Sequence, residues 1–433
     1  MTKELEHKIK DGSARAAVVG LGYVGLPLAV EFATSGLRVT GIDVSRTKVD
    51  AINAGRSYIL DVPTERVEKL VSDGLLEATS DFAAISDVDT INICVPTPLR
   101  KTREPDLSYV IGAIDSLIPH MRPGQLLILE STTYPGTTDE IVLPRLRAAG
   151  LEPGKDVEVA FSPERTDPGN KLYDTRSIPK VVGGCTPLAS RASRALYGRC
   201  IDNVVMVSSP RVAEMVKLLE NTFRSVNIAL ANEMAMMCDH LGIDVWEVID
   251  AAATKPFGFM PFYPGPGLGG HCIPVDPLYL TWKARAEGFE PRFIELAGQI
   301  NAQKPEFVAS KVMDALNDRS KSLRGSRILA LGVAYKRDVD DVRESPALDV
   351  MALLLDKGAD ITFSDPFVAE VELRGTTLHS VTTDADTIAA ADAVLLLTDH
   401  TAFDRPAIAG AARLLIDTRN AFKGIAGDHI LRV

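Results

Sequence analysis

The stretch Ala16-Ala17-Val18-Val19-Gly20-Leu21-Gly22-Tyr23-Val24-Gly25 indicates the fold of the first part of the chain. Its apolar run is typical of a buried strand and ends at the spacing Gly-x-Gly-x-x-Gly, and a helical pattern follows over residues 26–35. The three glycines allow a tight turn and close contact between the backbone and a pyrophosphate at the helix N-terminus. We therefore expect a dinucleotide site; the alternative is a glycine turn without a ligand.

An acid after the next strand strengthens this expectation. Asp43 ends the strand pattern of residues 38–43, where a carboxylate can hold the ribose hydroxyls of the cofactor. Such an acid favours NAD over NADP, because it would repel a 2′-phosphate. Lys48 lies about one helical turn further on and is expected to contact the cofactor phosphate or ribose; a solvated lysine is the alternative.

Strand and helix signals alternate through this part of the chain and then give way to helices. Further strand patterns cover residues 90–95, 125–130, 157–161 and 180–183. One helical pattern then runs from Ser209-Pro210, an N-cap followed by proline in the first turn, to Gly242. About 32 residues at 1.5 Å each make this helix roughly 48 Å long. Shorter helical patterns cover residues 245–253 and 293–317.

Strand patterns return near the C-terminus. They cover residues 327–331, 360–364, 393–398 and 413–417. Alternating strands and helices argue for parallel sheets covered by helices. The expected fold class is α/β, with two Rossmann-like doubly wound domains joined by a central helical domain that contains the long helix. The expected domain boundaries are residues 1–208, 209–318 and 319–433.

The composition argues against several classes of function. Of the 433 residues, 46% are apolar and 24% are charged, as in soluble globular proteins. The net charge of −11 argues against nucleic acid and anionic membranes as partners. No apolar stretch reaches the roughly 18 residues of a membrane helix, and the polar residues 1–13 do not resemble a signal peptide. The five cysteines lack metal-ligand spacing, so we expect a cytoplasmic, reduced and metal-free protein.

A cysteine in a glycine-rich loop is the strongest catalytic signal. Gly270-His271-Cys272 closes the run Tyr263-Pro264-Gly265-Pro266-Gly267-Leu268-Gly269-Gly270, and Asp276 follows. A thiol in such a loop can approach a ligand closely, with an acid at hand. A dehydrogenase that carries a nucleophilic cysteine can oxidise an alcohol beyond the aldehyde, through a thioester, to an acid.

Polar residues after predicted strands form a second group of candidates. They lie in Cys94-Val95-Pro96-Thr97-Pro98, in Glu130-Ser131-Thr132-Thr133-Tyr134-Pro135-Gly136-Thr137-Thr138 and in Phe161-Ser162-Pro163-Glu164-Arg165. A doubly wound sheet binds its cofactor at such strand ends, and the hydroxyl-rich segment can hold the nicotinamide side of the site or order a water. The respective alternatives are a proline turn, a capping turn and an ion pair at a domain edge.

Basic residues form a third group. Lys217, Asn221 and Arg224 share one face of the long helix, because they lie at i, i+4 and i+7. This face indicates a polar seam toward a ligand; a solvent-exposed stripe is the alternative. Lys336 and Arg343 follow the first strand of the C-terminal α/β region, where basic side chains suit an anionic ligand; ordinary surface charge is the alternative.

Taken together, these segments resemble the UDP-glucose/GDP-mannose dehydrogenase family. The resemblance covers nearly the whole chain. In order, it is carried by the glycine loop, Val95-Pro96-Thr97-Pro98, Ser131-Thr132, Ser162-Pro163-Glu164, Lys217 with Asn221, Gly269-Gly270-His271-Cys272 with Asp276, and Lys336 with Arg343. It implies an NAD-binding domain, a helical dimerisation domain and a C-terminal UDP-sugar-binding domain. NAD as cofactor, a UDP-sugar as substrate and a homodimer are the corresponding expectations.

The resemblance also implies roles for single residues. Cys272 is expected to be the nucleophile, with Lys217 and Asp276 supporting proton transfer and water positioning. Glu164 would assist thioester hydrolysis, Thr132 would help hold the catalytic water, and Asn221 would steady the developing oxyanion. The expected cofactor-binding residues are Gly20, Gly22, Tyr23, Val24, Gly25, Asp43, Lys48, Pro96, Thr97, Thr132 and Arg343. The expected substrate-binding residues are Glu164, Arg165, Lys217, Asn221, Arg224, Tyr263, Gly269 and Lys336.

Within the family, residues 162–169, 221–227 and 262–267 resemble the branch that acts on UDP-N-acetylhexosamines. The arginine that usually precedes the glycine loop in the UDP-glucose branch is not evident, and Lys255-Pro256 occupies its region. Residues 248–286 are most similar to UDP-N-acetylglucosamine 6-dehydrogenases, with UDP-N-acetylmannosamine enzymes second.

We therefore expect NAD-dependent, four-electron oxidation of C6 of UDP-N-acetylglucosamine to the uronic acid, through a thiohemiacetal and a thioester on Cys272. UDP-N-acetylmannosamine and UDP-glucose are the alternative substrates. A two-electron dehydrogenase for a β-hydroxyacid and a non-catalytic, NAD-responsive binding protein are the alternative functions.

Overall fold

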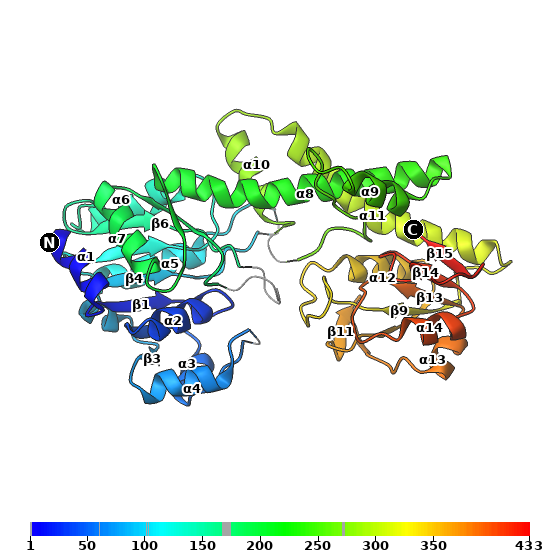
Figure 1. The fold of residues 1–433 in the computed structure, drawn as a ribbon, viewed down its shortest axis with the longest axis horizontal. Helices are drawn as coiled ribbons and strands as arrows, with labels where there is room; N and C mark the ends of the chain where they lie inside the picture. Colours follow the sequence, from blue (N-terminus) through cyan, green and yellow to red (C-terminus); the bar gives the residue numbers. More distant parts are fainter. Residues whose placement is uncertain (1, 60, 101, 103, 167–174, 271–272) are drawn as a thin grey trace. The chain divides into compact units, whose positions relative to one another are not determined.

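The computed structural model describes residues 2–59, 61–100, 102, 104–166, 175–270 and 273–433. The chain divides into two compact units, which are described separately (Figure 1). Unit 1 comprises Met1–Glu220 with Leu278–Gly288, and unit 2 comprises Asn221–Pro277 with Phe289–Val433.

Unit 1 is built on an eight-stranded sheet with the order β3-β2-β1-β4-β5-β6-β7-β8. Its strands are β1 (Arg15–Val19), β2 (Arg38–Ile42), β3 (Leu76–Thr79), β4 (Thr90–Ile93), β5 (Leu126–Leu129), β6 (Glu158–Phe161), β7 (Lys180–Gly184) and β8 (Val204–Val207). All neighbours are parallel except β6 and β7, which are antiparallel. The order from β3 to β6 is that of a doubly wound dinucleotide-binding sheet.

Helices pack on both faces of this sheet because its strands are apolar on both sides. Ala16 and Val18 of β1 belong to one hydrophobic core, and Ala17 and Val19 belong to another. Successive side chains of a strand point to opposite faces, so a doubly covered strand is a continuous apolar run. The helices of this part are α1 (Thr2–Asp11), α2 (Gly25–Thr34), α3 (Arg46–Asn53), α4 (Thr64–Ser72), η1 (Phe82–Asp87), α5 (Ser108–Leu117), η2 (Ile118–His120), η3 (Thr138–Val142), α6 (Leu143–Ala148), α7 (Pro187–Tyr197) and α10 (Asp276–Ala286).

The predicted long helix is confirmed as α8 (Pro210–Leu241), which has 32 residues. The Ser209 hydroxyl accepts a hydrogen bond from Val212 N at 3.3 Å, as expected for the predicted N-cap. The following helices are α9 (Val245–Ala253) and α11 (Arg292–Asn317). None of the described helices combines the length and apolar character needed to cross a membrane.

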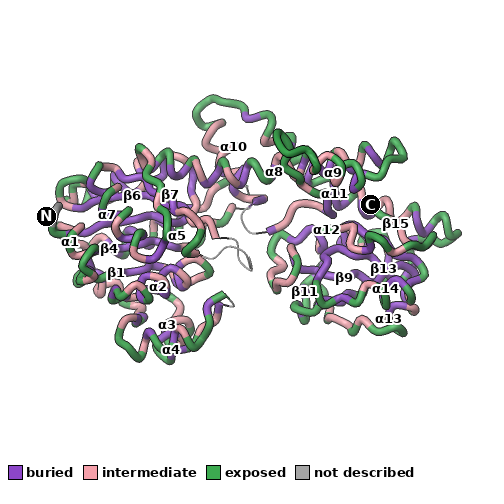
Figure 2. Tube along the Cα trace, in the orientation of Figure 1, coloured by how far each residue is buried: buried purple, intermediate pink, exposed green. Residues whose placement is uncertain are grey.

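Unit 2 contains a second parallel sheet with the order β10-β9-β13-β14-β15. Its strands are β9 (Arg327–Leu331), β10 (Asp360–Ser364), β13 (Ala393–Leu396), β14 (Leu415–Asp417) and β15 (Ile430–Arg432). Around it lie the hairpin β11 (Glu370–Leu373) and β12 (Thr376–His379), and the helices α12 (Pro346–Asp356), α13 (Ala385–Ala390) and α14 (Arg405–Ala411). This order is the other common doubly wound arrangement. The strands of both sheets are mostly buried (Figure 2), so the predicted fold class, with two Rossmann-like sheets and a helical region, is confirmed.

Candidate active site

The glycine loop after β1 leaves a cradle at the N-terminus of α2. Gly20 has a φ of +89°, and an added Cβ there would lie 2.5 Å from Cys94 O. A Cβ on Gly25 would clash with the carbonyl group of Gly20, 2.9 Å from its carbon. By contrast, a Cβ on Gly22 would meet no atom within 4 Å. Two glycines are thus required by the packing of the loop, and the third leaves open space that fits the pyrophosphate of a dinucleotide.

Asp43 joins the glycine loop to the turn after β2. Its carboxylate accepts hydrogen bonds from Leu21 N at 2.8 Å and from Ser45 N at 2.9 Å. The Lys48 ammonium lies 3.1 Å from Asp43 Oδ2, so the structure brings these two predicted cofactor residues together. Asp43 Oδ1 accepts only one of these hydrogen bonds, and a carboxylate oxygen can accept two. A ribose hydroxyl can therefore still donate to it.

The loops that follow β4 and β5 contact each other. The Ser131 hydroxyl donates to Val95 O at 2.7 Å, which brings the segment of Thr132 beside the segment of Pro96 and Thr97. Of the expected cofactor residues here and in the glycine loop, Thr132, Thr97 and Val24 are half-buried, whereas Pro96 and Tyr23 are exposed.

A buried carboxylate that the sequence reasoning missed fixes the loop after β5. Glu214 of α8 is fully buried. It accepts hydrogen bonds from Gly136 N at 2.5 Å, from Thr138 N at 2.9 Å and from the Thr138 hydroxyl at 2.7 Å. Burial raises the pKa of the Glu214 carboxyl, while a position at the start of η3 favours its negative charge. The sequence did contain a signal for this buried carboxylate, because Glu214 lies within the apolar pattern at the start of the long helix.

Glu164, which is expected to assist hydrolysis, lies just after β6. Its Oε1 accepts hydrogen bonds from Arg165 N at 2.8 Å and from Thr166 N at 2.6 Å, and also from the Thr166 hydroxyl. The neighbouring Arg165 donates two hydrogen bonds to the carboxylate of Glu220, the shorter at 2.6 Å. The ion pair that the sequence left open for this segment therefore forms between Arg165 and Glu220.

Two further charged residues that the sequence reasoning missed lie beside Glu164. The Lys180 ammonium lies 2.7 Å from Glu130 Oε2 and 3.0 Å from Glu164 Oε2. The sequence signal was that Glu130 and Lys180 each lie in a predicted buried strand. Buried charges need partners, so an ion pair was to be expected for each of them. Nothing in the sequence stated which partner each would have.

The polar face predicted on α8 divides by burial. Lys217 and Asn221 are buried, whereas Arg224 is exposed, so a solvent-exposed stripe does not describe the first two. Asn221 Nδ2 donates to Asp276 Oδ2 at 2.5 Å, and Asp276 is 2% exposed. Two expected catalytic residues of unit 2 that are 55 positions apart are thus in contact. Cys272, the expected nucleophile, lies outside the described residues, as does His271.

The glycine-rich run before Cys272 packs against the segment between β9 and α12. A Cβ on Gly269 would lie 2.6 Å from Pro346 Cδ, and a Cβ on Gly270 would lie 2.9 Å from the Tyr335 ring. This segment also carries Lys336 and Arg343, the expected anion-binding residues. Lys336 is half-buried, whereas Arg343 is exposed and pairs with Asp341 at 2.6 Å.

Polar contacts also fix this run on the helices of unit 2. Gly265 N donates to Asn232 Oδ1 of α8 at 3.1 Å, and Asn232 Nδ2 donates to Asn301 Oδ1 of α11 at 3.0 Å. The ring of Tyr263 stacks on Trp246, with 5.9 Å between the centroids. The Tyr263 hydroxyl, for which a substrate contact is expected, donates to Asp250 in α9 at 2.9 Å.

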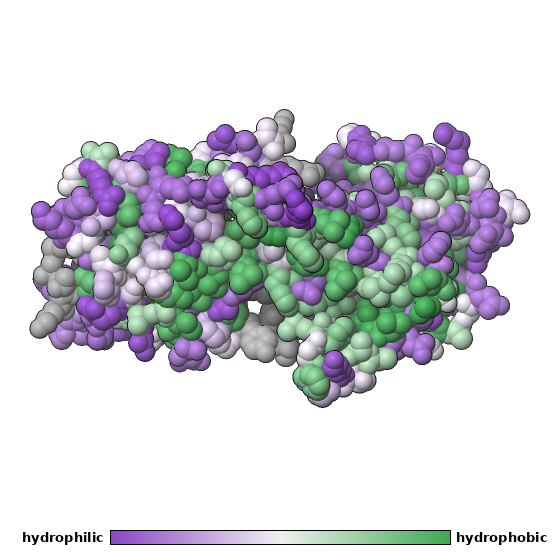
Figure 3. All heavy atoms as spheres, turned by 90° about the horizontal axis from the view of Figure 1, so that it is seen from above, coloured by the Kyte–Doolittle hydropathy of each residue, from purple (hydrophilic) through white to green (hydrophobic). Residues whose placement is uncertain are grey.

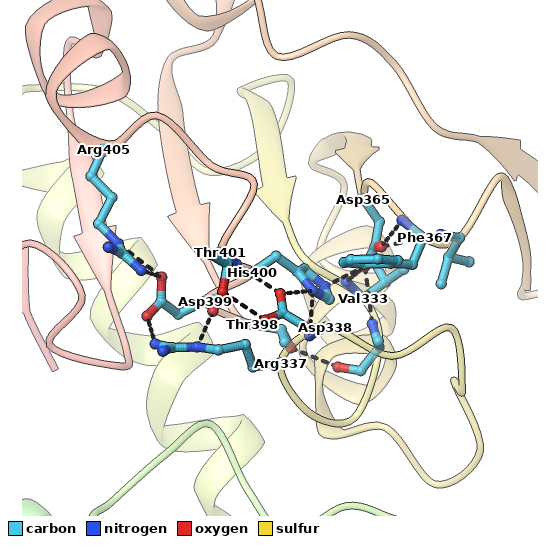
Figure 4. Close-up of polar contacts among 12 residues, drawn as sticks. Val333, Arg337, Asp338, Asp365, Phe367, Thr398, Asp399, His400, Thr401 and Arg405 are labelled. Carbon is cyan, nitrogen blue, oxygen red and sulfur yellow. Dashed lines mark hydrogen bonds and ion pairs between the residues drawn. The ribbon is translucent and has the colours of Figure 1, made fainter. Parts of the chain in front are cut away.

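The second sheet has a polar network at the switch point between β9 and β13 (Figure 4). His400 is fully buried, with Nε2 3.0 Å from Asp365 Oδ2, and its Nδ1 accepts a hydrogen bond from Asp338 N at 3.0 Å. The imidazole proton is therefore on Nε2. Arg337 Nε donates to Asp399 O at 2.6 Å. These contacts anchor the loop that carries Lys336 at the carboxyl edge of the sheet, where such folds bind their ligands.

Comparison with known proteins assigns the family. Models of three domains of the UDP-glucose/GDP-mannose dehydrogenase family match the chain: the NAD-binding domain at residues 14–201, the central domain at residues 211–303 and the UDP-binding domain at residues 329–424.

Single proteins agree with this assignment. The UDP-N-acetyl-D-mannosamine dehydrogenase of Salmonella typhimurium is 34% identical over 94% of this chain and 99% of its own length. The NDP-N-acetyl-D-galactosaminuronic acid dehydrogenase of Ralstonia nicotianae is 35% identical over 93% of this chain and 95% of its own. A solved UDP-D-ManNAc dehydrogenase from Pyrococcus horikoshii has a TM-score of 0.88 and 34% identity, and the match covers 97% of this chain and 99% of that one. The chain therefore belongs to the UDP-glucose/GDP-mannose dehydrogenase family and is an NAD-dependent UDP-sugar dehydrogenase.

Proposed function

We propose that this enzyme oxidises C6 of a UDP-N-acetylhexosamine to the uronic acid. The observation that carries the proposal is the full-length similarity to relatives whose names contain an N-acetylhexosamine or its uronic acid, at 34% and 35% identity. The mannosamine in the name of the Salmonella relative favours the manno epimer as the first substrate to test. The gluco epimer, expected from residues 248–286, stays a sequence-based prediction, and UDP-glucose is the further alternative.

The proposed chemistry runs through the Cys272 thiol. Bound NAD would accept a hydride from C6 in each of the two oxidations. Lys217, directly or through a water, assists removal of the alcohol proton. The Cys272 sulfur then adds to the aldehyde carbon as a thiohemiacetal, and loss of the second hydride leaves a thioester. Water cleaves the thioester, so one alcohol, two NAD⁺ and one water give one carboxylate, two NADH and three protons.

The contact between Asn221 and Asp276 suits the proposed roles of both residues. The Asn221 amide has two N–H groups, and one of them donates to Asp276 Oδ2. The second N–H can donate to an oxygen that gains negative charge on C6. Asp276 in turn fixes the orientation of the amide, and its carboxylate can also accept a hydrogen bond from the hydrolytic water.

The remaining expected residues would hold the two ligands. Lys336 supplies positive charge on the segment against which Gly269 packs, which suits the diphosphate of a UDP-sugar. Arg343, on the same segment, stays proposed as a cofactor contact. Arg165, Arg224 and Tyr263 stay proposed as further substrate contacts. The NAD-binding role stays proposed for the glycine loop with Tyr23 and Val24, for Asp43 with Lys48, and for Pro96, Thr97 and Thr132. The domain boundaries at residues 208/209 and 318/319 are likewise proposed.

The test is the yield of NADH from limiting UDP-N-acetylmannosamine, UDP-N-acetylglucosamine or UDP-glucose with excess NAD. Two NADH per sugar for one N-acetylhexosamine, with a much slower reaction of UDP-glucose, is the expected result. One NADH per sugar would instead point to a simple two-electron dehydrogenase. Cys272→Ser should fail to complete both oxidations at the normal rate; a variant that completes them would refute the covalent route.

We also propose a homodimer that forms through α8. Phe223, Leu230 and Met237 repeat every seven residues along α8, and their side chains are 47%, 56% and 46% exposed. Residues seven apart lie on one face of a helix, and an exposed apolar face of this kind is typical of an interface. Apolar side chains also lie among hydrophilic ones on the surface in Figure 3. Leu230→Glu should convert a dimer to a monomer in light scattering; an unchanged mass would contradict this interface.

A cytoplasmic location is proposed on chemical grounds. The mechanism requires a free Cys272 thiol, and a reducing compartment keeps thiols free. The cysteines that the structure describes, Cys94, Cys185, Cys200 and Cys238, are unpaired.

A further inference from the structure

A buried lysine joins two carboxylates in unit 1. Lys180 begins β7 and is 4% exposed. Its backbone N–H donates to Asn203 O at 2.9 Å, so the strand fixes the base of the side chain. Its ammonium forms the contacts of 2.7 Å with Glu130 and 3.0 Å with Glu164. Lys180 therefore occupies one defined position between the two acids.

Glu130 anchors this lysine. Its Oε1 accepts hydrogen bonds from Asn92 Nδ2 at 2.7 Å and from the Tyr197 hydroxyl at 2.7 Å. The Lys180 ammonium also lies 5.3 Å from the centre of the Tyr197 ring, within the range of a cation–π interaction. Glu130 is 1% exposed, so it serves the lysine and its buried neighbours rather than a ligand.

Glu164 is the most exposed member of the triad formed by Glu130, Lys180 and Glu164. Its side chain is 16% exposed, compared with 0% for Glu130. Its Oε1 is occupied by Arg165 and Thr166, whereas within the described part of the chain Oε2 accepts a hydrogen bond only from Lys180. A carboxylate oxygen has two lone pairs. One lone pair of Oε2 is thus left to accept a hydrogen bond from a water.

We propose that Lys180 is a positioning residue for thioester hydrolysis: anchored by Glu130, it keeps Glu164 ionised and directs one Glu164 oxygen at the attacking water. This inference rests on the function proposed above for Cys272 and Glu164. In this step the water oxygen bonds to C6, and the C6–S bond breaks with its electron pair going to sulfur. The water protons leave to solvent, and Glu164 acts as a hydrogen-bond acceptor that orients the water.

The electrostatics of the triad agree with this role. Burial by itself raises the pKa of Glu164, but the Lys180 charge and the hydrogen bonds from Thr166 and Lys180 lower it to about 2. Burial lowers the pKa of Lys180, whereas Glu130 and Glu164 raise it above its usual value. A carboxylate with such a low pKa is a weak base at neutral pH, which is why orientation of the water is its expected contribution.

Two other titratable groups close to the triad stay neutral in the range of the test. Burial raises the pKa values of the Cys94 thiol and the Tyr197 hydroxyl well above their usual range, so both stay neutral. The Arg165 guanidinium pairs with Glu220 at 2.6 Å. If the hydrolysis rate of a Lys180 variant falls at low pH where that of the wild type does not, the fall would therefore come from protonation of the carboxylates.

Lys180→Met tests the proposal directly. Each enzyme receives limiting UDP-N-acetylhexosamine and excess NAD, is quenched with acid, and is analysed by intact mass for the acyl adduct on sulfur. Loss of a neighbouring cation raises a carboxylate pKa by about 1–3 units. A pKa of about 2 raised by 1–3 units would be about 3–5. Hydrolysis by Lys180→Met should therefore slow by up to about tenfold at pH about 4, with accumulation of the adduct and almost no loss at pH about 8. Lys180→Arg, which retains the charge, should restore part of the rate at pH about 4.

A matched control removes a lysine charge from helix α1, elsewhere in unit 1. The Lys8 ammonium lies 3.2 Å from Asp89 Oδ1, and Asp89 precedes β4 at the opposite edge from Glu164. Lys8→Met therefore withdraws a cation from another largely buried carboxylate, and its pH profile should match that of the wild type. Thermal unfolding of each variant separates loss of folded protein from a change in hydrolysis.

A second variant keeps the test decisive if Lys180→Met does not fold. Lys180→Met combined with Glu130→Gln removes the unpaired buried charge on Glu130 but still withdraws the cation from Glu164. If the hydrolysis rate of this double variant depends on pH in the same way as that of the wild type, the proposal is overturned. Two NADH per sugar from the wild type would then leave the proposed function standing. If the wild type forms no NADH with any of the UDP-sugars, the proposed function itself fails.

Discussion

Gly22→Ala should separate cofactor binding from folding. Gly22 lies in the glycine loop and does not adopt a positive φ, and a Cβ there meets no protein atom within 4 Å. The folded chain should therefore accept alanine without strain. The new methyl group would, however, occupy the open side of the cradle at the N-terminus of α2, where the pyrophosphate is expected.

Gly22→Ala should raise the stability of the protein but lower its affinity for NAD. Replacing glycine at a compatible position stabilises a protein by about 0.4–1 kcal/mol, because the unfolded chain loses conformational freedom. A hydrogen bond to a charged group contributes about 1.5–3 kcal/mol. The loss of one backbone contact to the pyrophosphate should raise the Kd for NAD by roughly 10- to 150-fold.

Gly25→Ala is the matched control, three positions along the same loop. Its Cβ would lie 2.9 Å from the Gly20 carbonyl carbon, and closer still to the oxygen. We expect this variant to lose about 1–3 kcal/mol of stability from overpacking. Calorimetric titration with NAD measures binding, and denaturant unfolding without NAD measures stability. Wild-type affinity for NAD in Gly22→Ala, or a clear loss of its stability, would refute the reasoning.

Three further changes test the electrostatics. Lys304 is 1% exposed, its ammonium has no hydrogen-bond partner within the described residues, and burial lowers its pKa from 10.5 to about 8. Between these values the folded protein binds fewer protons than the unfolded chain, so the free energy of unfolding rises with pH through that window. Lys304→Met should therefore stabilise the protein by up to about 3 kcal/mol at pH about 7 and progressively less toward pH about 10.5; an equal gain at both pH values in urea unfolding would contradict this. Glu214→Gln would set an amide against the donors of Gly136 and Thr138, so it should cost about 1–3 kcal/mol in thermal unfolding, whereas the exposed Glu287→Gln, just after α10, should cost much less, because it loses only a surface ion pair with Lys283. His400→Phe should remove the imidazole donor to Asp365 and the acceptor of Asp338 N, so it should loosen the loop that carries Lys336 and weaken UDP binding about fivefold or more in calorimetric titration; unchanged affinity would show that the loop holds its position without His400.

The elements that the sequence predicted best depend on signals that act over a few residues. The bounds of α9 and β9 are those expected, and α8 differs from its predicted span by one residue at each end. Apolar periodicity, the Ser209-Pro210 cap and the glycine spacing are local properties, and they specify a helix or strand before any long-range contact forms. The hairpin of β11 and β12 and the antiparallel pairing of β6 with β7 were not predicted, since the pairing partner of a short strand is not a local property.

The sequence by itself therefore determined the fold class, the dinucleotide loop and the family, because order and spacing of motifs are properties of the chain. Only the tertiary structure decided which charged groups meet. Lys180 and Glu130 are 50 positions apart, and they pair because Glu130 follows β5 and Lys180 begins the antiparallel strand β7, so both lie at the same edge of one buried sheet, on either side of β6. Asn221 in α8 and Asp276 at the start of α10 are 55 positions apart, and they likewise come into contact only in the folded chain. The sequence indicates that a buried charged residue needs a partner, but the packing of strands and helices determines which partner it has.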